Sequence, residues 1–268
     1  MTRAAPPPET DPRVVAAAAA HPYPLLFATI SGAHLYGFAS PDSDFDVRGV
    51  HVLPQRELLG LDLGPETVET ARKDEDGFEL DLVTHDVRKF VGLLVKPNGY
   101  VLEQLCSPLV VVRGPYYEEL RALAGACVTR LHRHHYAGFF HSQRALLLKD
   151  DPPKLKPLLY LFRVVLTGLR LLRTGDVEAD LSRLAPAAGL PRLLELVERK
   201  RSGTERGTLD AAEAQEWLRA ADALCEELPA AAESGPLPTE VAPATRRALH
   251  DLLLRVRGVA SRRTEDPR

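Results

Sequence analysis

The segment SGAHLYGFASPDSDFDVRGV, residues 31–50, indicates both the fold and the chemistry of this chain. It begins at the end of a short apolar run, LLFATIS at 25–31, and it leads into a second strand-like run, FDVRGVHVL at 45–53. Between and within these runs, Asp42, Asp44 and Asp46 occupy alternate positions. Carboxylates held this close repel one another, so the segment predicts a positive partner between them.

Asp44 and Asp46 open the second strand-like run. Side chains alternate along a strand, so these two carboxylates share one face while Phe45 and Val47 point to the other. Two carboxylates on a rigid strand face suit a hard divalent cation such as Mg²⁺. A calcium loop does not fit, because its sixth position would be Val47 instead of glycine. Asp42 is interpreted as a turn residue.

A third carboxylate is expected from a neighbouring strand. The segment TVETARKDEDGFELDLVT, residues 67–84, alternates on both sides of the turn signal DEDG and predicts a hairpin. In its second strand Glu79 and Asp81 share a face. Asp81 is flanked by leucines, as expected of a central strand, and is the favoured third ligand. Glu79 is the alternative third ligand, or a solvated neighbour.

The first strand ends in Ser31, Gly32 and Ala33. Glycine at such a turn lets the backbone approach a phosphate closely and present N–H groups to it. The turn indicates a phosphate site only in combination with the paired carboxylates that follow it.

Composition sets the class of protein. The 268 residues are 45% hydrophobic, and 34 Lys and Arg nearly balance 37 Asp and Glu, so net charge predicts no particular partner. The three cysteines are widely spaced and form no metal-ligand pair, which suits a reducing cytoplasm. The alanine run near the N-terminus is too short for a signal peptide or membrane span, so a soluble, cytoplasmic protein without membrane contact is expected.

The two halves of the chain have different patterns. Residues 1–20 predict a flexible N-terminus with a short helix, and residues 21–115 predict a small mixed α/β domain. In that domain a helix is expected at 85–95, a short helix capped by Asn98 follows, and LVVVR at 109–113 closes the sheet. Residues 116–268 predict an all-helical domain, so the fold class is α+β. Its expected helices are 116–148, 155–174, 190–202, 209–227 and 238–262.

The helical half is basic between residues 130 and 173, where Lys and Arg far outnumber Asp150 and Asp151. On the helix at 155–174, Lys156, Tyr160 and Arg163 form a stripe on an otherwise apolar helix. Such a stripe is expected to line the cleft between the domains, with the cations on phosphate and the tyrosine on a base or sugar. The alternative is a helix surface paired with nearby acids. Three interpretations stay open for LHRHHYAGFFHSQR at 131–144: a zinc site on its histidines, a plain helix surface, and hydrogen bonding or phosphate contact by His135, Tyr136, Gln143 and Arg144.

A glycine-led turn, a D-x-D strand and a third aspartate on a later strand resemble the DNA polymerase β-like nucleotidyltransferase superfamily. More narrowly, SGAHLYGFASPDSDFDVRGV, DLVTHDVRKF, PNGYVLEQL and KPLLYLFRVVLTG resemble predicted nucleotidyltransferases associated with RNA ligases and RNA repair. The similarity covers roughly residues 25 to 175. It implies a polymerase-β-like catalytic domain followed by the helical domain.

The resemblance also implies roles for individual residues. Asp44, Asp46 and Asp81 would bind Mg²⁺ or Mn²⁺, with Asp81 activating the acceptor. The donor would be an NTP such as ATP, the acceptor an RNA end, and an RNA ligase a functional partner.

The predicted nucleotide-binding set joins the turn, which the resemblance implies, with the stripe of the basic helix, which the helical spacing predicts. It comprises Ser31, Gly32, Ala33, Lys156, Tyr160 and Arg163.

One position departs from the family pattern. The family turn is Gly-Ser, whereas this chain has Ala33 after Gly32 and lacks that hydroxyl. This departure keeps open a non-catalytic module that binds nucleotide or RNA. A protein acceptor and a small-molecule acceptor also stay open, because the sequence shows no recognised RNA-binding module.

Overall fold

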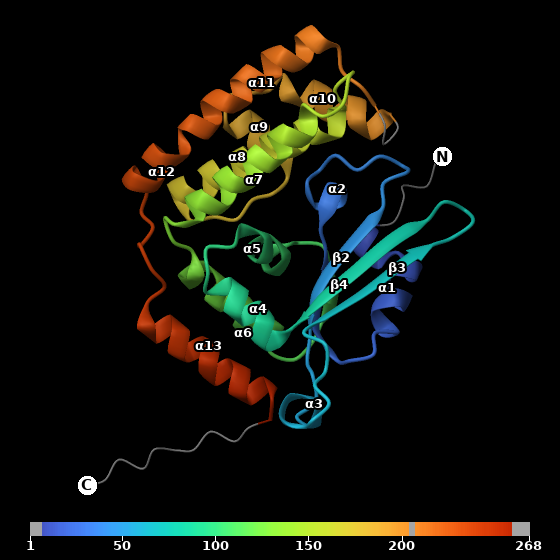
Figure 1. Ribbon diagram of the computed structural model, residues 1–268, viewed down its shortest axis with the longest axis vertical. Coiled ribbons are helices and arrows are strands. Elements are labelled where there is room, and N and C mark those ends of the chain that lie inside the picture. The colour runs from blue at the N-terminus through green and yellow to red at the C-terminus, as the bar shows by residue number, and fades with distance from the viewer. Residues whose placement is uncertain (1–6, 204–206, 259–268) are drawn as a thin grey trace.

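A five-stranded mixed sheet forms the framework of the first half of the chain (Figure 1). The computed structural model describes residues 7–203 and 207–258. The strand order is β3-β4-β2-β1-β5, so the two strands with the predicted aspartates are central neighbours. The strands are β1 Leu25–Ile30, β2 Phe45–His51, β3 Thr67–Lys73, β4 Glu79–Asp86 and β5 Val110–Arg113.

β2 and β4 run parallel, whereas the other strand pairs are antiparallel. The parallel register places Asp46 opposite Asp81 and continues to His51 opposite Asp86. The β3–β4 hairpin turns at Gly77, whose φ of 86° lies in the left-handed region that glycine adopts without strain. Parallel pairing thus aligns the strand ends that carry the acidic residues.

Helices cover both faces of the sheet. On one face α1 packs over a small cluster that includes Val14, Ile30 and Leu80. On the other face α4 and α5 bury Phe27, Phe90 and other residues of the main core. Short helices α2 and α3 follow β1 and β2. The helices of this half are η1 Pro8–Thr10, α1 Pro12–Ala19, α2 Gly32–Leu35, α3 Arg56–Leu59, α4 Val87–Leu94 and α5 Gly99–Cys106.

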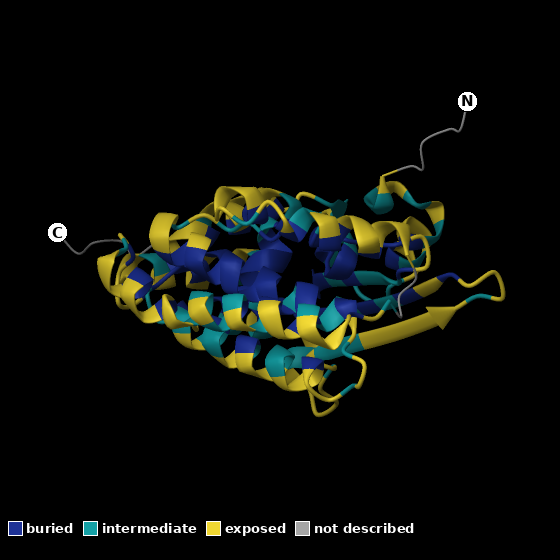
Figure 2. Ribbon diagram, turned by 90° about the horizontal axis from the view of Figure 1, so that it is seen from above, coloured by how far each residue is buried: buried dark blue, intermediate teal, exposed yellow. Residues whose placement is uncertain are grey.

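The remainder of the described chain is helical and is built around α8. This 20-residue helix is buried on most sides and packs on α7, α9, α11 and α12. Figure 2 shows that buried residues fill the interior of the molecule and exposed ones its outer surfaces. Its many leucines and valines explain this position, because a helix that is apolar all round is stable only when surrounded. The helices are α6 Tyr117–Ala124, η2 Gly125–Cys127, α7 His132–Leu147, α8 Leu155–Thr174, α9 Leu181–Ala187, α10 Leu193–Ser202, α11 Ala211–Glu226, α12 Leu228–Ser234 and α13 Pro243–Val256.

The predicted α+β class is confirmed, with the sheet first and the helices after it. The helix expected at 155–174 has those bounds, and Asn98 caps α5 by accepting from the Tyr100 amide. Short helices α2, α3, α9 and α12 were not predicted. The main hydrophobic core is continuous across the expected boundary at 115/116, which stays a prediction. Of the expected flexible terminus, residues 1–6 lie outside the described residues, as do residues 259–262 of the last helix.

Two expectations from composition concern cysteines and membranes. Cys106, Cys127 and Cys225 are free thiols, and burial raises the pKa of each, to about 11 for Cys127. In the described ranges, the helices are too short or too polar for any of them to cross a bilayer.

Candidate active site

The turn after β1 brings the backbone against the acidic strand. Ser31 donates its backbone N–H to the Asp46 carbonyl oxygen at 2.8 Å. Gly32 has a φ of 61°, and a Cβ at this position would overlap the carboxylate of Asp46. Glycine is therefore required here for two reasons. Its φ is positive, and the Asp46 side chain fills the space that a Cβ would occupy.

A single arginine joins the two predicted carboxylates of β2 and β4. Arg48 Nη2 donates to Asp46 Oδ1 at 2.7 Å and to Asp81 Oδ2 at 3.0 Å. Its Nη1 donates to the Asp81 carbonyl oxygen at 2.7 Å, and its Nε donates to the Tyr100 hydroxyl at 2.8 Å. Arg48 is thus the positive partner that the acidic segment requires. Arg48 is therefore a salt-bridge partner of both acidic strands.

The electrostatics of Asp46 reflect this crowding. Burial raises the pKa of Asp46, and the nearby carboxylates of Asp44 and Asp81 raise it further, while Arg48 and Lys156 act in the opposite direction. Asp44 lies just before β2 and is near enough to act on Asp46. The three predicted carboxylates therefore belong to one electrostatic site, which favours added positive charge.

The donor set suits a hard divalent ion, because Asp44, Asp46 and Asp81 offer only carboxylate oxygens. In residues 7–203 and 207–258, however, no three Asp, Glu, His or Cys side chains are gathered as a ready-made metal cluster. Arg48 lies between Asp46 and Asp81 instead. A metal could bind both carboxylates only after the guanidinium moves aside.

A cavity of about 440 Å³ opens beside Gly32 and Asp46. Apart from these residues and Ser31, its walls are mainly aromatic and come from both halves of the chain. The lining residues are Ser31, Gly32, Tyr36, Asp46, Tyr100, His135, Phe139 and Tyr160. A polar floor with aromatic walls is suited to a nucleotide, whose phosphates are charged and whose base stacks.

Two residues of the predicted α8 stripe lie at this site. Tyr160 lines the cavity, and its ring meets Tyr36 edge-on at 5.4 Å between centroids. Lys156 acts electrostatically on Asp46 and lines an adjoining cavity of about 480 Å³ that also contains Tyr160. Lys149 and Lys154 line the same adjoining cavity. The first turns of α8 thus supply positive charge next to the acidic strands.

Arg163, the third residue of the stripe, is placed differently. It is fully buried, and its Nη1 donates to the two carboxylate oxygens of Glu103 at 2.7 and 2.9 Å. Its guanidinium also lies 3.8 Å from the centre of the Tyr36 ring. The structure therefore gives Arg163 a protein partner in place of the predicted phosphate.

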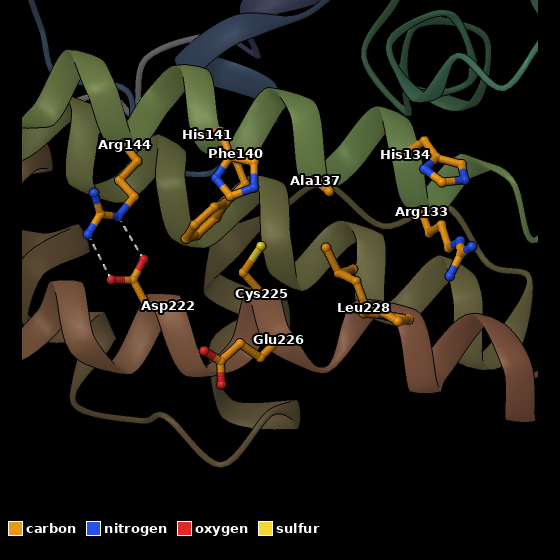
Figure 3. A pocket seen from close by; sticks show the side chains of 11 residues that line it. Arg133, His134, Ala137, Phe140, His141, Arg144, Asp222, Cys225, Glu226 and Leu228 are labelled. Carbon is orange, nitrogen blue, oxygen red and sulfur yellow. Dashed lines mark hydrogen bonds and ion pairs between the residues drawn. The ribbon is translucent and has the colours of Figure 1, made fainter.

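The histidine-rich segment divides between two sides of α7. His135 lines the cavity beside Asp46, and burial, followed by the charges of His132 and Arg163, lowers its pKa to about 4. On the other side His134 and His141 line a separate cavity of about 560 Å³. There Arg144 pairs with Asp222 of α11 at 2.8 Å, as Figure 3 shows. This second cavity shares no lining residue with the cavity beside Asp46.

The remaining predicted residues lie around the site. Ala33 is buried in the main core and does not line the cavity. Glu79 pairs with Lys73 across the β3–β4 hairpin. Asp42 lies in the turn before β2, where Ser40 Oγ donates to it at 2.7 Å.

Sequence reasoning missed Tyr36, Tyr100, Glu103 and Phe139. A signal for Glu103 was present: it is a lone acid in the apolar helix GYVLEQLC, and such a helix must supply a buried acid with a partner. The three aromatic residues carry no comparable local signal, because aromatic side chains are common in cores.

Comparison with known proteins agrees with this geometry. Residues 9–255 match the RNA repair pathway DNA polymerase beta family, RlaP. The uncharacterized protein MJ0002 of Methanocaldococcus jannaschii is 32% identical over 157 residues, which are 59% of this chain and 64% of that protein. The uncharacterized protein YcgL of Bacillus subtilis is 28% identical over 194 residues, 68% of this chain and 71% of that protein.

The alignment thus spans slightly less than two thirds of the archaeal relative. The family match is longer: residues 9–255 include the glycine turn, the paired aspartates of β2 and β4, and the helices that enclose the cavity. The chain therefore belongs to the RNA repair pathway DNA polymerase beta family.

Proposed function

We propose that this protein is a metal-dependent nucleotidyltransferase that moves a nucleoside monophosphate from an NTP to an RNA end and releases pyrophosphate. The observation that carries the proposal is the register of Asp46 opposite Asp81, beside the close approach of Gly32. Membership of an RNA repair polymerase beta family supports both the reaction class and the RNA acceptor.

The carboxylates of Asp44, Asp46 and Asp81 would hold Mg²⁺ or Mn²⁺. When bound, such ions neutralise phosphate charge and favour the alkoxide form of an attacking hydroxyl. Arg48 would then give up its bonds to the carboxylates of Asp46 and Asp81.

The chain's own residues would orient the donor. Gly32 lines the cavity and would offer its backbone N–H to the triphosphate, whereas the Ser31 N–H is held by the Asp46 carbonyl oxygen; Lys156 would add positive charge. Tyr160 offers a ring for stacking of the base. Arg163 would act indirectly, by holding Tyr36 in the cavity wall.

In the reaction the acceptor hydroxyl oxygen forms a bond to the α-phosphorus. The bond from that phosphorus to the bridging oxygen breaks, and pyrophosphate leaves with the electron pair. The hydroxyl proton passes to the carboxylate of Asp81, whose side chain is 45% exposed and so can be reached by a large acceptor. The same displacement with a terminal phosphate oxygen as nucleophile needs no proton acceptor.

The cavity beside the site suits the acceptor strand. It shares Tyr160 with the nucleotide cavity and is lined by Lys149, Lys154 and Lys156. Lysines along a groove bind the phosphates of a nucleic-acid backbone. RNA ends altered by such transfer would next be joined, so we also propose a functional link to an RNA ligase.

The test is transfer from each labelled NTP, with Mg²⁺ or Mn²⁺, to RNAs with defined ends. We expect labelled RNA from the native protein and none from Asp46→Asn or Asp81→Asn. Glu79→Gln is the matched control, because Glu79 lies on the same strand but is paired with Lys73. The proposal fails if no NTP labels any RNA, or if Asp46→Asn together with Asp81→Asn leaves transfer unchanged.

A second candidate is a non-catalytic nucleotide- or RNA-binding module. The ion pairs of Arg48 favour it, because they neutralise Asp46 and Asp81 without a metal. Calorimetry separates the two candidates: NTP binding that is indifferent to Mg²⁺ supports the module. A label on a protein or small molecule, with RNA unchanged, would instead redirect the acceptor assignment.

A further inference from the structure

Three leucines protrude from the connection between β2 and β3. The exposed fractions are 85% for Leu59, 103% for Leu61 and 71% for Leu63. A single exposed leucine is ordinary, but three at alternate positions of one loop form an apolar patch. Residues 54–66, which we call the leucine loop, therefore present a surface that is unfavourable in water.

The leucine loop is held in a defined shape. α3 makes one helical turn, and Gly64 donates its N–H to the Glu57 carbonyl oxygen at 2.9 Å, closing the loop. The Tyr23 hydroxyl donates to the Glu57 carboxylate at 2.8 Å. A preformed apolar surface loses little conformational entropy on binding, which favours recognition.

The charges of the loop are mostly negative. Glu57, Asp62 and Glu66 accompany the leucines, against Arg56. An acidic rim around an apolar tip disfavours an anionic membrane surface and favours a groove that is apolar at its floor and basic at its edge.

The same molecule carries such a groove between α4 and α13. Its volume is about 390 Å³. Val91, Val95 and Leu253 contribute to an aliphatic floor, and none of the described residues that line the groove is acidic. The basic lining residues are Arg88, Arg246, Arg247 and His250.

The arginines of this α4–α13 groove are unusual for this protein. Most of its other arginines are held in ion pairs, such as Arg144 with Asp222. Within residues 7–203 and 207–258, the side chains of Arg88, Arg246 and Arg247 have no ion-pair or hydrogen-bond partner, and all three are exposed. The groove thus offers unpaired positive charge around an apolar floor.

The loop and the groove are neighbours. The end of α13 lies beside α3 in Figure 1, where Gln55 Nε2 donates to the Arg257 carbonyl oxygen at 2.8 Å. Arg257 in turn donates to the Leu53 carbonyl oxygen at 2.7 Å. Two complementary surfaces on one side of a protein can satisfy each other across a two-fold axis, each loop in the other copy's groove.

We propose that the protein forms a two-fold dimer in which the leucine loop of each copy enters the α4–α13 groove of the other. The leucines would cover Val91, Val95 and Leu253, and the acids of the loop would meet Arg88, Arg246 and Arg247. The contact lies apart from the acidic strands, so it does not depend on the proposed nucleotidyl transfer.

An RNA backbone is the other polyanion that such arginines could bind. The floor argues against it, because aliphatic side chains give bases no ring to stack on, whereas they pack well against leucine. A second copy accounts for the groove and for the exposed leucines together.

Sedimentation or light scattering of the full chain tests the proposal over a range of protein concentrations. We expect a dimer for the native protein, and for Leu59→Ser/Leu61→Ser/Leu63→Ser a rise of roughly tenfold or more in the dimer dissociation constant. Leu146→Ser/Leu148→Ser is the matched control, since these exposed leucines lie at the end of α7, and its dimer should be intact.

Charge reversal identifies the occupant of the groove. Arg246→Glu/Arg247→Glu should weaken the dimer, and adding Asp62→Arg/Glu66→Arg to the same chain should restore it. Circular dichroism and the melting temperature establish that each variant is folded; the substituted side chains are exposed, so folding should be retained.

Three outcomes would overturn the proposal. The native protein could be a monomer throughout, or the triple leucine variant could dimerise like the native chain. In the third outcome, Arg246→Glu/Arg247→Glu would leave the mass of the dimer unchanged and weaken binding of a single-stranded RNA oligonucleotide. That result would make the groove a nucleic-acid site.

Discussion

The guanidinium of Arg163 on α8 and the carboxylate of Glu103 on α5 form an ion pair at 2.7 and 2.9 Å, with both side chains buried. The hydroxyls of Tyr36 and Tyr136 also donate to Glu103, each at 3.4 Å. One buried acid of α5 therefore holds together α5, α8 and Tyr36 in the wall of the cavity beside Asp46. Because both charges are out of water, each depends on the other.

Removal of one partner should be costly. Glu103→Ala leaves the Arg163 charge buried and unpaired, so we expect the free energy of unfolding to fall by about 3–5 kcal/mol. Urea denaturation followed by circular dichroism measures the loss. The double variant Glu103→Leu/Arg163→Met removes both charges and keeps the volume, and it should recover most of the stability. A Glu103→Ala protein as stable as the native one would contradict the dependence.

The glycine turn gives a second prediction. Gly32→Ala adds a methyl group that overlaps the Asp46 carboxylate, so it should abolish nucleotidyl transfer in addition to its backbone cost of roughly 1–3 kcal/mol. Gly77→Ala is the matched control, because Gly77 has a φ of 86° but nothing near its added Cβ. It should lose stability and keep transfer. Equal activity of the two variants would show that the overlap has no consequence for the site.

Arg48 gives a third prediction, about the charge between the strands. Arg48→Met removes the bridge, so Asp46 and Asp81 repel each other until a cation replaces it. We expect Mg²⁺ to raise the melting temperature of Arg48→Met more than that of the native protein, by thermal scanning with and without the metal. Adding Asp46→Asn to Arg48→Met should remove the extra shift. If the shift does not grow in Arg48→Met, the arginine and the metal do not compete.

The central part of the candidate site was predictable from local sequence. The alternation of Asp44 and Asp46, and of Glu79 and Asp81, defined strand faces before any pairing was known. The parallel register then brings Asp46 opposite Asp81. The length and apolar character of residues 155–174 likewise sufficed to bound α8, because a pattern that persists over many turns leaves little ambiguity.

Contacts between residues that lie far apart in the chain were not predictable from the sequence. Whether Arg163 meets phosphate or protein is decided by Glu103, sixty positions away in the chain, and no local pattern connects the two. The four-residue helices α2 and α3 are too short to show a helical period. The exposure of Leu61 is also invisible in sequence, since an apolar residue in a loop is ordinarily expected to pack inward.

His135 gives a prediction about pH. Its pKa is lowered from 6.5 to about 4, mainly by burial, so between these values the unfolded chain binds a proton that the folded chain does not. Stability from this group is therefore complete above pH 6.5 and falls as the pH drops toward 4, by up to about 1.4 kcal/mol per pH unit. His135→Gln should flatten the slope of unfolding free energy against pH in this window, as urea titrations would measure. An unchanged slope in His135→Gln would mean that the folded protein admits the proton as readily as the unfolded chain.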